Sequence, residues 1–321
     1  MENKDATFRD ILLRLAAQEQ PFPAKYLHYF SDLTEEQSAL FANIWKELTN
    51  TKRISILEDL DELSEHDTLM DFSSVGKLAL NDHDEGVRET ALHLLWELEE
   101  KSFILTVIEL LIIDPSARVR ASAASLMGRF VYLGETDELS EHLNNRVIEA
   151  LLNTHKNDTE KLVKRHALES LGYSSRGEIT HLITQACTSK DHEWMTSSLY
   201  AMGRSADPSW SEIILKHFDH PEDIVREEAV RAAGELELTH TREKLLNILE
   251  NEENDDVRAA SIWSLSQIGG EGVREAITKQ TENIQDEELL IFIEDALDNL
   301  NFTEELSQFD LLDINNKETD E

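Results

Sequence analysis

Residues 222–234, EDIVREEAVRAAG, contain a pattern that returns along most of the chain. Val225, Ala229 and Ala232 are spaced by four and then three residues, which places them on one side of an α-helix. Glu222 stands at the N-terminal end, where an acidic side chain meets free backbone N–H groups. The stretch therefore predicts one short helix with one buried face.

Val225 has counterparts at regular intervals, which we call the anchors. They are Val87, Val119, Val163, Trp194, Val225, Val257 and Leu289. The steps between successive anchors are 32, 44, 31, 31, 32 and 32 residues. A period in this range is typical of a solenoid, in which each unit buries its apolar face only by stacking on its neighbours. We therefore expect a chain of stacked helical repeats.

Two columns of polar residues accompany the anchors. Three positions before each anchor stand Asp84, Ser116, Glu160, Asp191, Glu222, Asn254 and Asp286, which are mostly good N-cap or first-turn residues. The position after the anchor is basic in Arg88, Arg120, Lys164, Arg226 and Arg258, and fails only at Met195 and Leu290. We expect the arginines to pair with acids of the next repeat and so tie neighbouring units together.

The units DHDEGVRETALHLLWEL, DPSARVRASAASLMG, HPEDIVREEAVRAAGEL and ENDDVRAASIWSLSQIGG resemble HEAT repeats of the bacterial, phycobilisome-lyase-like type. The resemblance covers roughly residues 33–300. It implies an all-α, armadillo-like superhelix, here of about eight antiparallel helix pairs, with first (A) helices on the convex side and second (B) helices on the concave side. The family is known mainly for binding and scaffolding.

Three segments are expected along the chain. Residues 1–64 form an N-terminal cap with a degenerate first repeat, whose helix at 33–48 begins with a capping box of Thr34 and Gln37. Residues 65–300 form the HEAT repeats, and residues 301–321 form an acidic C-terminal cap or tail. The 44-residue step places an insertion at about 130–160, divided between a longer connection and an extended A helix near 140–155.

Composition limits the partners. The chain has 66 Asp and Glu against 30 Lys and Arg, a net charge of −36, which opposes binding to nucleic acid and favours basic partners. Cys187 is the only cysteine, which excludes an internal disulfide and favours a reducing compartment. The longest apolar run, 103–113, is too short for a bilayer, and the N-terminus lacks a signal-peptide core. We expect a cytoplasmic protein, without membrane contact, and favour a monomer.

Candidate binding residues follow from the helical period, because the residue six positions after each anchor points away from the buried stripe. On three consecutive repeats this residue is Tyr200, Arg231 and Trp263, the types most enriched at interface hot spots. Our hypothesis is that these three form a partner-binding row on the concave side, with Glu169 and Glu227 beside it and His93 and Trp96 near the first end. The alternative is that the aromatic side chains pack between neighbouring B helices.

Enzyme chemistry finds little support in the residues. Residues 164–172, KRHALESLG, resemble a unit of the HEAT-repeat deoxyhypusine hydroxylases, but His166 is followed by Ala167 and the His-Glu ligand pairs of that di-iron site do not recur. His217 and His220, with Asp219 and Asp223, are better explained as a solvated turn than as a metal site.

We therefore expect no catalytic residues, no metal and no cofactor. The expected function is that of a non-catalytic protein–protein interaction scaffold or adaptor. The alternative is an enzyme or enzyme-accessory protein of the HEAT-repeat lyase or hydroxylase kind.

Overall fold

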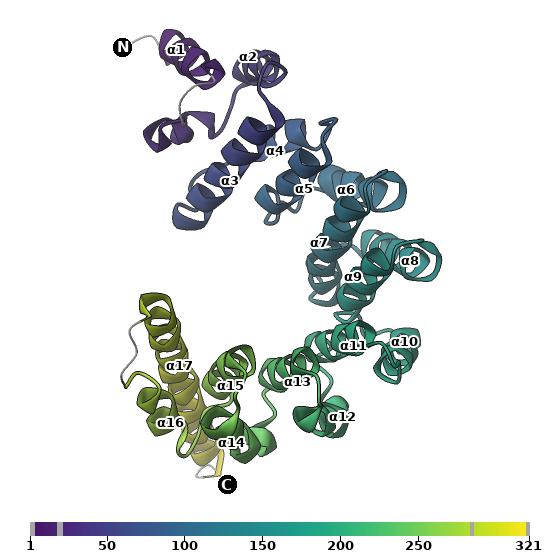
Figure 1. Ribbon diagram of the computed structural model, residues 1–321, viewed down its shortest axis with the longest axis vertical. Helices are drawn as coiled ribbons and strands as arrows, with labels where there is room; N and C mark the ends of the chain where they lie inside the picture. Colours follow the sequence, from purple (N-terminus) through teal and green to yellow (C-terminus); the bar gives the residue numbers. More distant parts are fainter. Residues whose placement is uncertain (1–3, 18–21, 283–285, 319–321) are drawn as a thin grey trace. The chain divides into compact units, whose positions relative to one another are not determined.

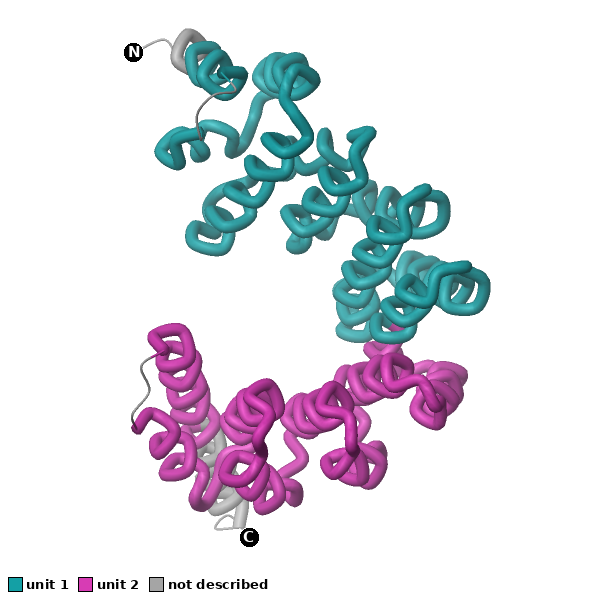
Figure 2. The backbone as a smooth tube through the Cα atoms, in the orientation of Figure 1, with its two compact units in different colours: residues 1–170 teal, residues 171–321 magenta. Residues whose placement is uncertain are grey.

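A computed structural model describes residues 4–17, 22–282 and 286–318, with side chains described from residue 8 to residue 305 of these ranges (Figure 1). Within the described ranges the regular structure is entirely helical. The chain divides into two compact units, residues 1–170 and 171–321 (Figure 2). The predicted all-α fold of antiparallel helix pairs is confirmed, and the described residues contain eight such pairs.

The first unit begins with two helical segments and continues with four helix pairs. The segments are α1 (Lys4–Ala16) and the 3-10 helix η1 (Ala24–Phe30). The pairs are α2 (Glu35–Trp45) with α3 (Asn50–His66), α4 (Ser73–Ala79) with α5 (Glu85–Leu94), α6 (Lys101–Ile113) with α7 (Ala117–Glu135), and α8 (Glu141–Asn157) with α9 (Lys161–Leu171). The predicted capping box of Thr34 and Gln37 starts α2.

The second unit contains the other four pairs. They are α10 (Gly177–Cys187) with α11 (His192–Arg204), α12 (Ser211–Lys216) with α13 (Asp223–Glu235), α14 (Arg242–Asn251) with α15 (Asp255–Ile268), and α16 (Val273–Lys279) with α17 (Glu287–Glu318). Short 3-10 segments lie in the connections, namely η2 (Pro208–Trp210), η3 (His217–Asp219) and η4 (Thr239–Thr241).

Each anchor is the third residue of the second helix of its pair. The five valine anchors are fully buried, whereas Trp194 is half-buried and Leu289 is 36% exposed. The predicted N-cap residues stand directly before these helices. Asp84, for example, accepts hydrogen bonds from the backbone N–H groups of Gly86 and Val87. The sequence period therefore gives the correct register of the second helices, and the expectation of a buried anchor holds best for valine.

Within each unit the second helices pack against one another in succession, as α11, α13 and α15 do in the second unit (Figure 1). This packing is close at Gly234 of α13, where an added Cβ would lie 2.7 Å from the Cα of Ser264 on α15. We call the surface formed by the second helices of a unit its B-helix face.

Arginines after the anchors tie one repeat to the next, as predicted. Arg88 donates from Nε and Nη2 to the two carboxylate oxygens of Asp114, each at 2.8 Å. It also donates from Nη1 to the backbone carbonyl of Asp82 at 2.9 Å. Arg120 repeats this arrangement with the side chain of Asp158 and the carbonyl of Asp114. We call this chain of contacts the arginine ladder.

The ladder begins one repeat earlier than the sequence pattern indicated. Arg53 of α3 bonds to the Asp82 carboxylate, which also accepts from Trp45 Nε1 at 2.9 Å. Lys52 occupies the anchor position there, so a search for a Val-Arg pair passes over this repeat.

The ladder is also present in the second unit. Arg226 donates to both carboxylate oxygens of Glu252 at 3.0 and 2.9 Å, and to the carbonyl of His220 at 2.8 Å. Arg258 differs, because it bonds to Asp255 on its own helix and is 41% exposed.

The insertion differs from its prediction in one respect. Its extra residues lengthen two helices, α7 to 19 residues and α8 to 17, and leave only a short connection between them. The predicted extended A helix is therefore present, and the longer connection is wrong, because α7 continues through Phe130 and Val131, which are buried.

The end of the described chain is one long helix. The segment predicted as a separate cap or tail, 301–321, continues α17 as far as Glu318. The side chains from residue 306 and the whole of residues 319–321 lie outside the described part of the chain. No helix in the described ranges is long and apolar enough to cross a bilayer.

Candidate functional site

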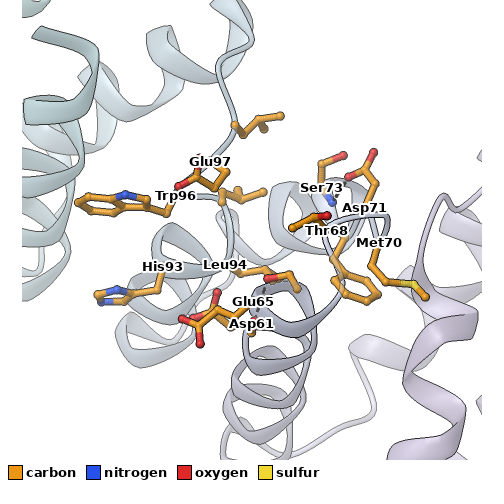
Figure 3. A pocket seen from close by; sticks show the side chains of 14 residues that line it. Asp61, Glu65, Thr68, Met70, Asp71, Ser73, His93, Leu94, Trp96 and Glu97 are labelled. Carbon is orange, nitrogen blue, oxygen red and sulfur yellow. Dashed lines mark hydrogen bonds between the residues drawn. The ribbon is translucent and has the colours of Figure 1, made fainter. Parts of the chain in front are cut away.

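A cavity of about 780 Å³ opens in the first unit between the C-terminal end of α3, the loop that follows it and the C-terminal end of α5. We call it the α3–α5 cavity. Two of the predicted binding residues, His93 and Trp96, line it. In Figure 3 they lie on one side of the cavity, Thr68 and Asp71 lie on the other, and Asp61 and Glu65 lie between. Its volume is within the range of small-ligand and side-chain pockets.

Carboxylates dominate the charge of this cavity. Asp61 and Glu65 are one turn apart on α3, and neither carboxylate has a hydrogen bond or ion pair with a described residue. Burial raises the pKa of Asp61, the nearby Glu65 charge raises it further, and His93 lowers it. Two other carboxylates already have partners, because Asp71 accepts from the backbone N–H of Ser73 and Glu97 pairs with Arg129.

Trp96 supplies the exposed aromatic surface of the cavity, since its side chain is 39% exposed whereas Phe72 is buried. Trp96 stands nine residues after its anchor, where the next four repeats carry Gly128, Gly172, Gly203 and Gly234. Glycine in α13 allows the next helix to approach closely, so a tryptophan at this place departs from the packing rule of the fold. The backbone carbonyl of Trp96 accepts from Arg129 Nη1 at 3.2 Å, which holds the end of α5.

A second cavity, of about 300 Å³, lies in the second unit and brings together Tyr200, Arg231 and Trp263. Tyr200 and Trp263 are half-buried and Arg231 is exposed. Arg231 pairs with the predicted neighbour Glu227 at 3.0 Å. The three side chains are therefore neighbours on one B-helix face, and their role in partner binding stays a prediction.

Arg204 is a member of this second cavity that the sequence analysis missed. Its guanidinium lies 5.0 Å from the centre of the Tyr200 ring and 5.9 Å from that of Tyr173, and it pairs with Glu235 at 2.8 Å. Burial raises the pKa of Tyr173 to about 12 and also raises the pKa of Glu235. The charges here are already matched within the protein, in contrast to those of the α3–α5 cavity.

Glu169 belongs to the first unit, where its carboxylate lies 3.8 Å from Arg165 and 3.9 Å from His166. The predicted row is in the second unit, so its relation to Glu169 stays a prediction. His166 itself is held by a hydrogen bond between its Nδ1 and the Ser125 hydroxyl.

The two histidines that precede α13, His217 and His220, form hydrogen bonds with backbone groups. His217 Nδ1 lies 2.7 Å from the Ile213 carbonyl, and His220 Nδ1 accepts from the Glu222 N–H at 3.1 Å. Across the described residues, no group of three or more His, Cys, Asp or Glu side chains is arranged to hold a metal ion.

The geometry agrees with solved repeat proteins. Yeast importin-β (Kap95p) superposes with a TM-score of 0.51 at 12% identity, covering 92% of this chain and 46% of its own. The chain therefore spans about half the length of importin-β. The Escherichia coli protein YibA aligns at 14% identity over 88% of this chain and 99% of its own, with a TM-score of 0.44. Human deoxyhypusine hydroxylase aligns at 13% identity over 93% and 97%, with a TM-score of 0.37.

Comparison by sequence finds a match over a smaller part of the chain than comparison by structure does. No curated protein matches the chain. The profile of HEAT repeats matches residues 211–298, which contain α12 to α15 and part of the last pair. The likeness to importin-β shows the fold and carries no partner or activity with it. The matched profile shows HEAT repeats in residues 211–298, and the other described helix pairs follow the same arrangement of helices.

Proposed function

We propose that this protein is a non-catalytic scaffold that binds another protein, preferably a basic one, on its B-helix faces. The observation that carries the proposal is the α3–α5 cavity, which is lined by the exposed Trp96 and by two carboxylates, Asp61 and Glu65, that have no ion pair with a described residue. Interface hot spots combine aromatic anchors with pockets that a partner side chain fills. The net charge of −36 adds long-range attraction for a cationic partner.

The second cavity supports the same function in a different way. Tyr200, Arg231 and Trp263 are residue types that dominate binding energy at interfaces, and they meet on one face. A scaffold with one contact region on each unit would gain affinity from both regions when a single partner reaches them.

The test begins with affinity capture from the native organism, followed by binding measurements with the purified partner. We expect affinity to fall steeply from low to physiological salt, because exposed charges are screened over about 8 Å at that ionic strength. Changing Tyr200, Arg231 and Trp263 together to Ala should weaken binding further. A partner that binds with equal affinity at both salt concentrations and to the triple variant contradicts the proposal.

The enzyme alternative is tested on the protein purified from its own organism. Elemental analysis would detect a stoichiometric metal, and the absorption spectrum would detect a chromophore. Either finding would favour the lyase or hydroxylase kind of function over a scaffold.

A further inference from the structure

We infer that the α3–α5 cavity takes the guanidinium group of an arginine side chain presented by a basic segment of the partner. The inference rests on the proposed function and names the chemistry that one of its sites recognises. It follows from the charge, the aromatic surface and the apolar lining of this cavity.

The charge of the cavity is of one sign. None of its lining residues is a lysine or an arginine, and the carboxylates of Asp61 and Glu65 have no ion pair with a described residue. Two like charges one turn apart on a helix repel each other, and burial adds to the penalty on Asp61. A cation between them would relieve both effects.

The shape favours guanidinium over ammonium. Trp96 offers a partly exposed indole, and a planar guanidinium stacks on an aromatic face while its N–H groups remain free to bond at its edges. The carboxylates of Asp61 and Glu65 can accept hydrogen bonds from those N–H groups. An ammonium group is compact and strongly hydrated and makes less use of a flat surface.

The apolar part of the cavity lining suits the aliphatic part of the same side chain. Met70, Phe72 and Leu98 line it with apolar atoms. The methylene groups of arginine commonly lie along such surface while the charged end reaches polar groups. One arginine therefore matches all three parts of the cavity.

The experiment uses the full-length protein and two peptides, acetyl-Ala-Ala-Arg-Ala-Ala-amide and the same peptide with citrulline in place of arginine. Citrulline keeps the shape and removes the charge. Binding is followed by NMR or by tryptophan fluorescence. We expect the arginine peptide to bind roughly tenfold more tightly than the citrulline peptide.

Variants locate the effect. The double change Asp61→Asn and Glu65→Gln should abolish the preference for arginine, whereas Glu58→Gln with Glu62→Gln should leave it. The second pair alters the net charge equally on the same helix, outside the cavity lining. Trp96→Leu, which keeps apolar contact but loses the ring face, should weaken the arginine peptide about threefold or more. Thermal unfolding of each variant checks that the fold persists.

Equal binding of the two peptides, no binding at millimolar peptide, or equal losses in the two double variants would overturn the inference. If that occurs while the purified partner still binds in a salt-dependent manner, the scaffold function stands and only the arginine site fails. If the peptides behave as expected and no protein partner binds, the scaffold function fails and the site remains.

Discussion

Arg88 and Asp114 form a fork-to-fork ion pair across two successive repeats, with both N–O distances at 2.8 Å and side-chain exposures of only 9% and 3%. The hydrogen bonds that Arg88 donates to Asp114 raise the pKa of Arg88 above its usual value, against the opposing effect of burial. The pair is therefore a structural joint rather than a surface contact.

This joint predicts a large loss of stability when Arg88 is replaced by alanine. Removing Arg88 leaves the buried Asp114 carboxylate without its countercharge, although the Ser116 backbone N–H still donates to it, which costs about 3 kcal/mol. The matched control is Arg258→Ala, which removes an exposed pair within one helix and should cost less than about 1 kcal/mol. Urea unfolding followed by circular dichroism measures both. Partner affinity should be the same in both variants, and equal stability losses would contradict the structural role of Arg88.

The acceptors of the ladder predict how its contribution depends on pH. Burial raises the pKa of Asp158, but hydrogen bonds from Arg120 and from the Glu160 backbone outweigh burial and leave it below the usual 3.8. A carboxylate with a depressed folded pKa stabilises the protein above its unfolded pKa, and this stabilisation is lost as the pH falls through the folded pKa. We therefore expect the stability difference between the wild type and Arg120→Ala to be constant near neutral pH and to shrink below about pH 4.

Urea unfolding at a series of pH values measures that difference. A gap that is unchanged down to pH 2 would show that Asp158 does not titrate through its contact with Arg120. The exposed Arg118, two residues away, pairs with Glu89 and serves as the control substitution.

Two glycines of the second unit predict opposite responses to alanine. A Cβ at Gly172 would lie 2.6 Å from the Ala201 backbone on α11, so Gly172→Ala should destabilise the protein by about 1–3 kcal/mol. A Cβ at Gly177, the first residue of α10, would meet nothing within 4 Å, so Gly177→Ala should be neutral or stabilise by up to about 1 kcal/mol. Thermal melting compares the two. Similar melting temperatures would mean that α11 can move away from Gly172 without loss.

The second cavity predicts a separation of affinity from stability. Arg231 is exposed and pairs with Glu227 one turn earlier on the same helix, so Arg231→Ala should change stability by less than about 1 kcal/mol. If the row binds the partner, the same change should lower affinity about tenfold. Calorimetric titration and thermal melting of the same sample distinguish a binding role from a packing role. A lower melting temperature with unchanged affinity would favour the packing alternative for this cluster.

The helical repeat could be predicted because its signal is local and recurrent. A valine three residues after a capping residue occurs in five of the second helices, and in each it is fully buried. The arginine one position later bonds to an acidic side chain of the next repeat, as Arg88, Arg120 and Arg226 do. The pattern did not identify Arg53 as part of the ladder, because Lys52 stands where the pattern requires an apolar residue, although Thr49 still caps the helix.

The candidate site was predictable only in part. His93 and Trp96 follow from their place in the repeat, and both line the α3–α5 cavity. Asp61 and Glu65 come from the irregular first repeat, where no column of equivalent residues marks them. Arg204 was missed for a similar reason, since its contact with Glu235 is a tertiary one that spacing along a single helix does not reveal.

The ladder also determines where this protein tolerates a deletion. Asp82 and Asp114 each accept one arginine on the side chain and another on the backbone carbonyl. Excision of residues 83–114, one full period, would bring Arg120 to the carbonyl of Asp82 and leave the charges of the ladder matched. Removal of half that length would strand a guanidinium or a carboxylate in the interior. Removal of one whole repeat should therefore cost this protein less stability than removal of half a repeat.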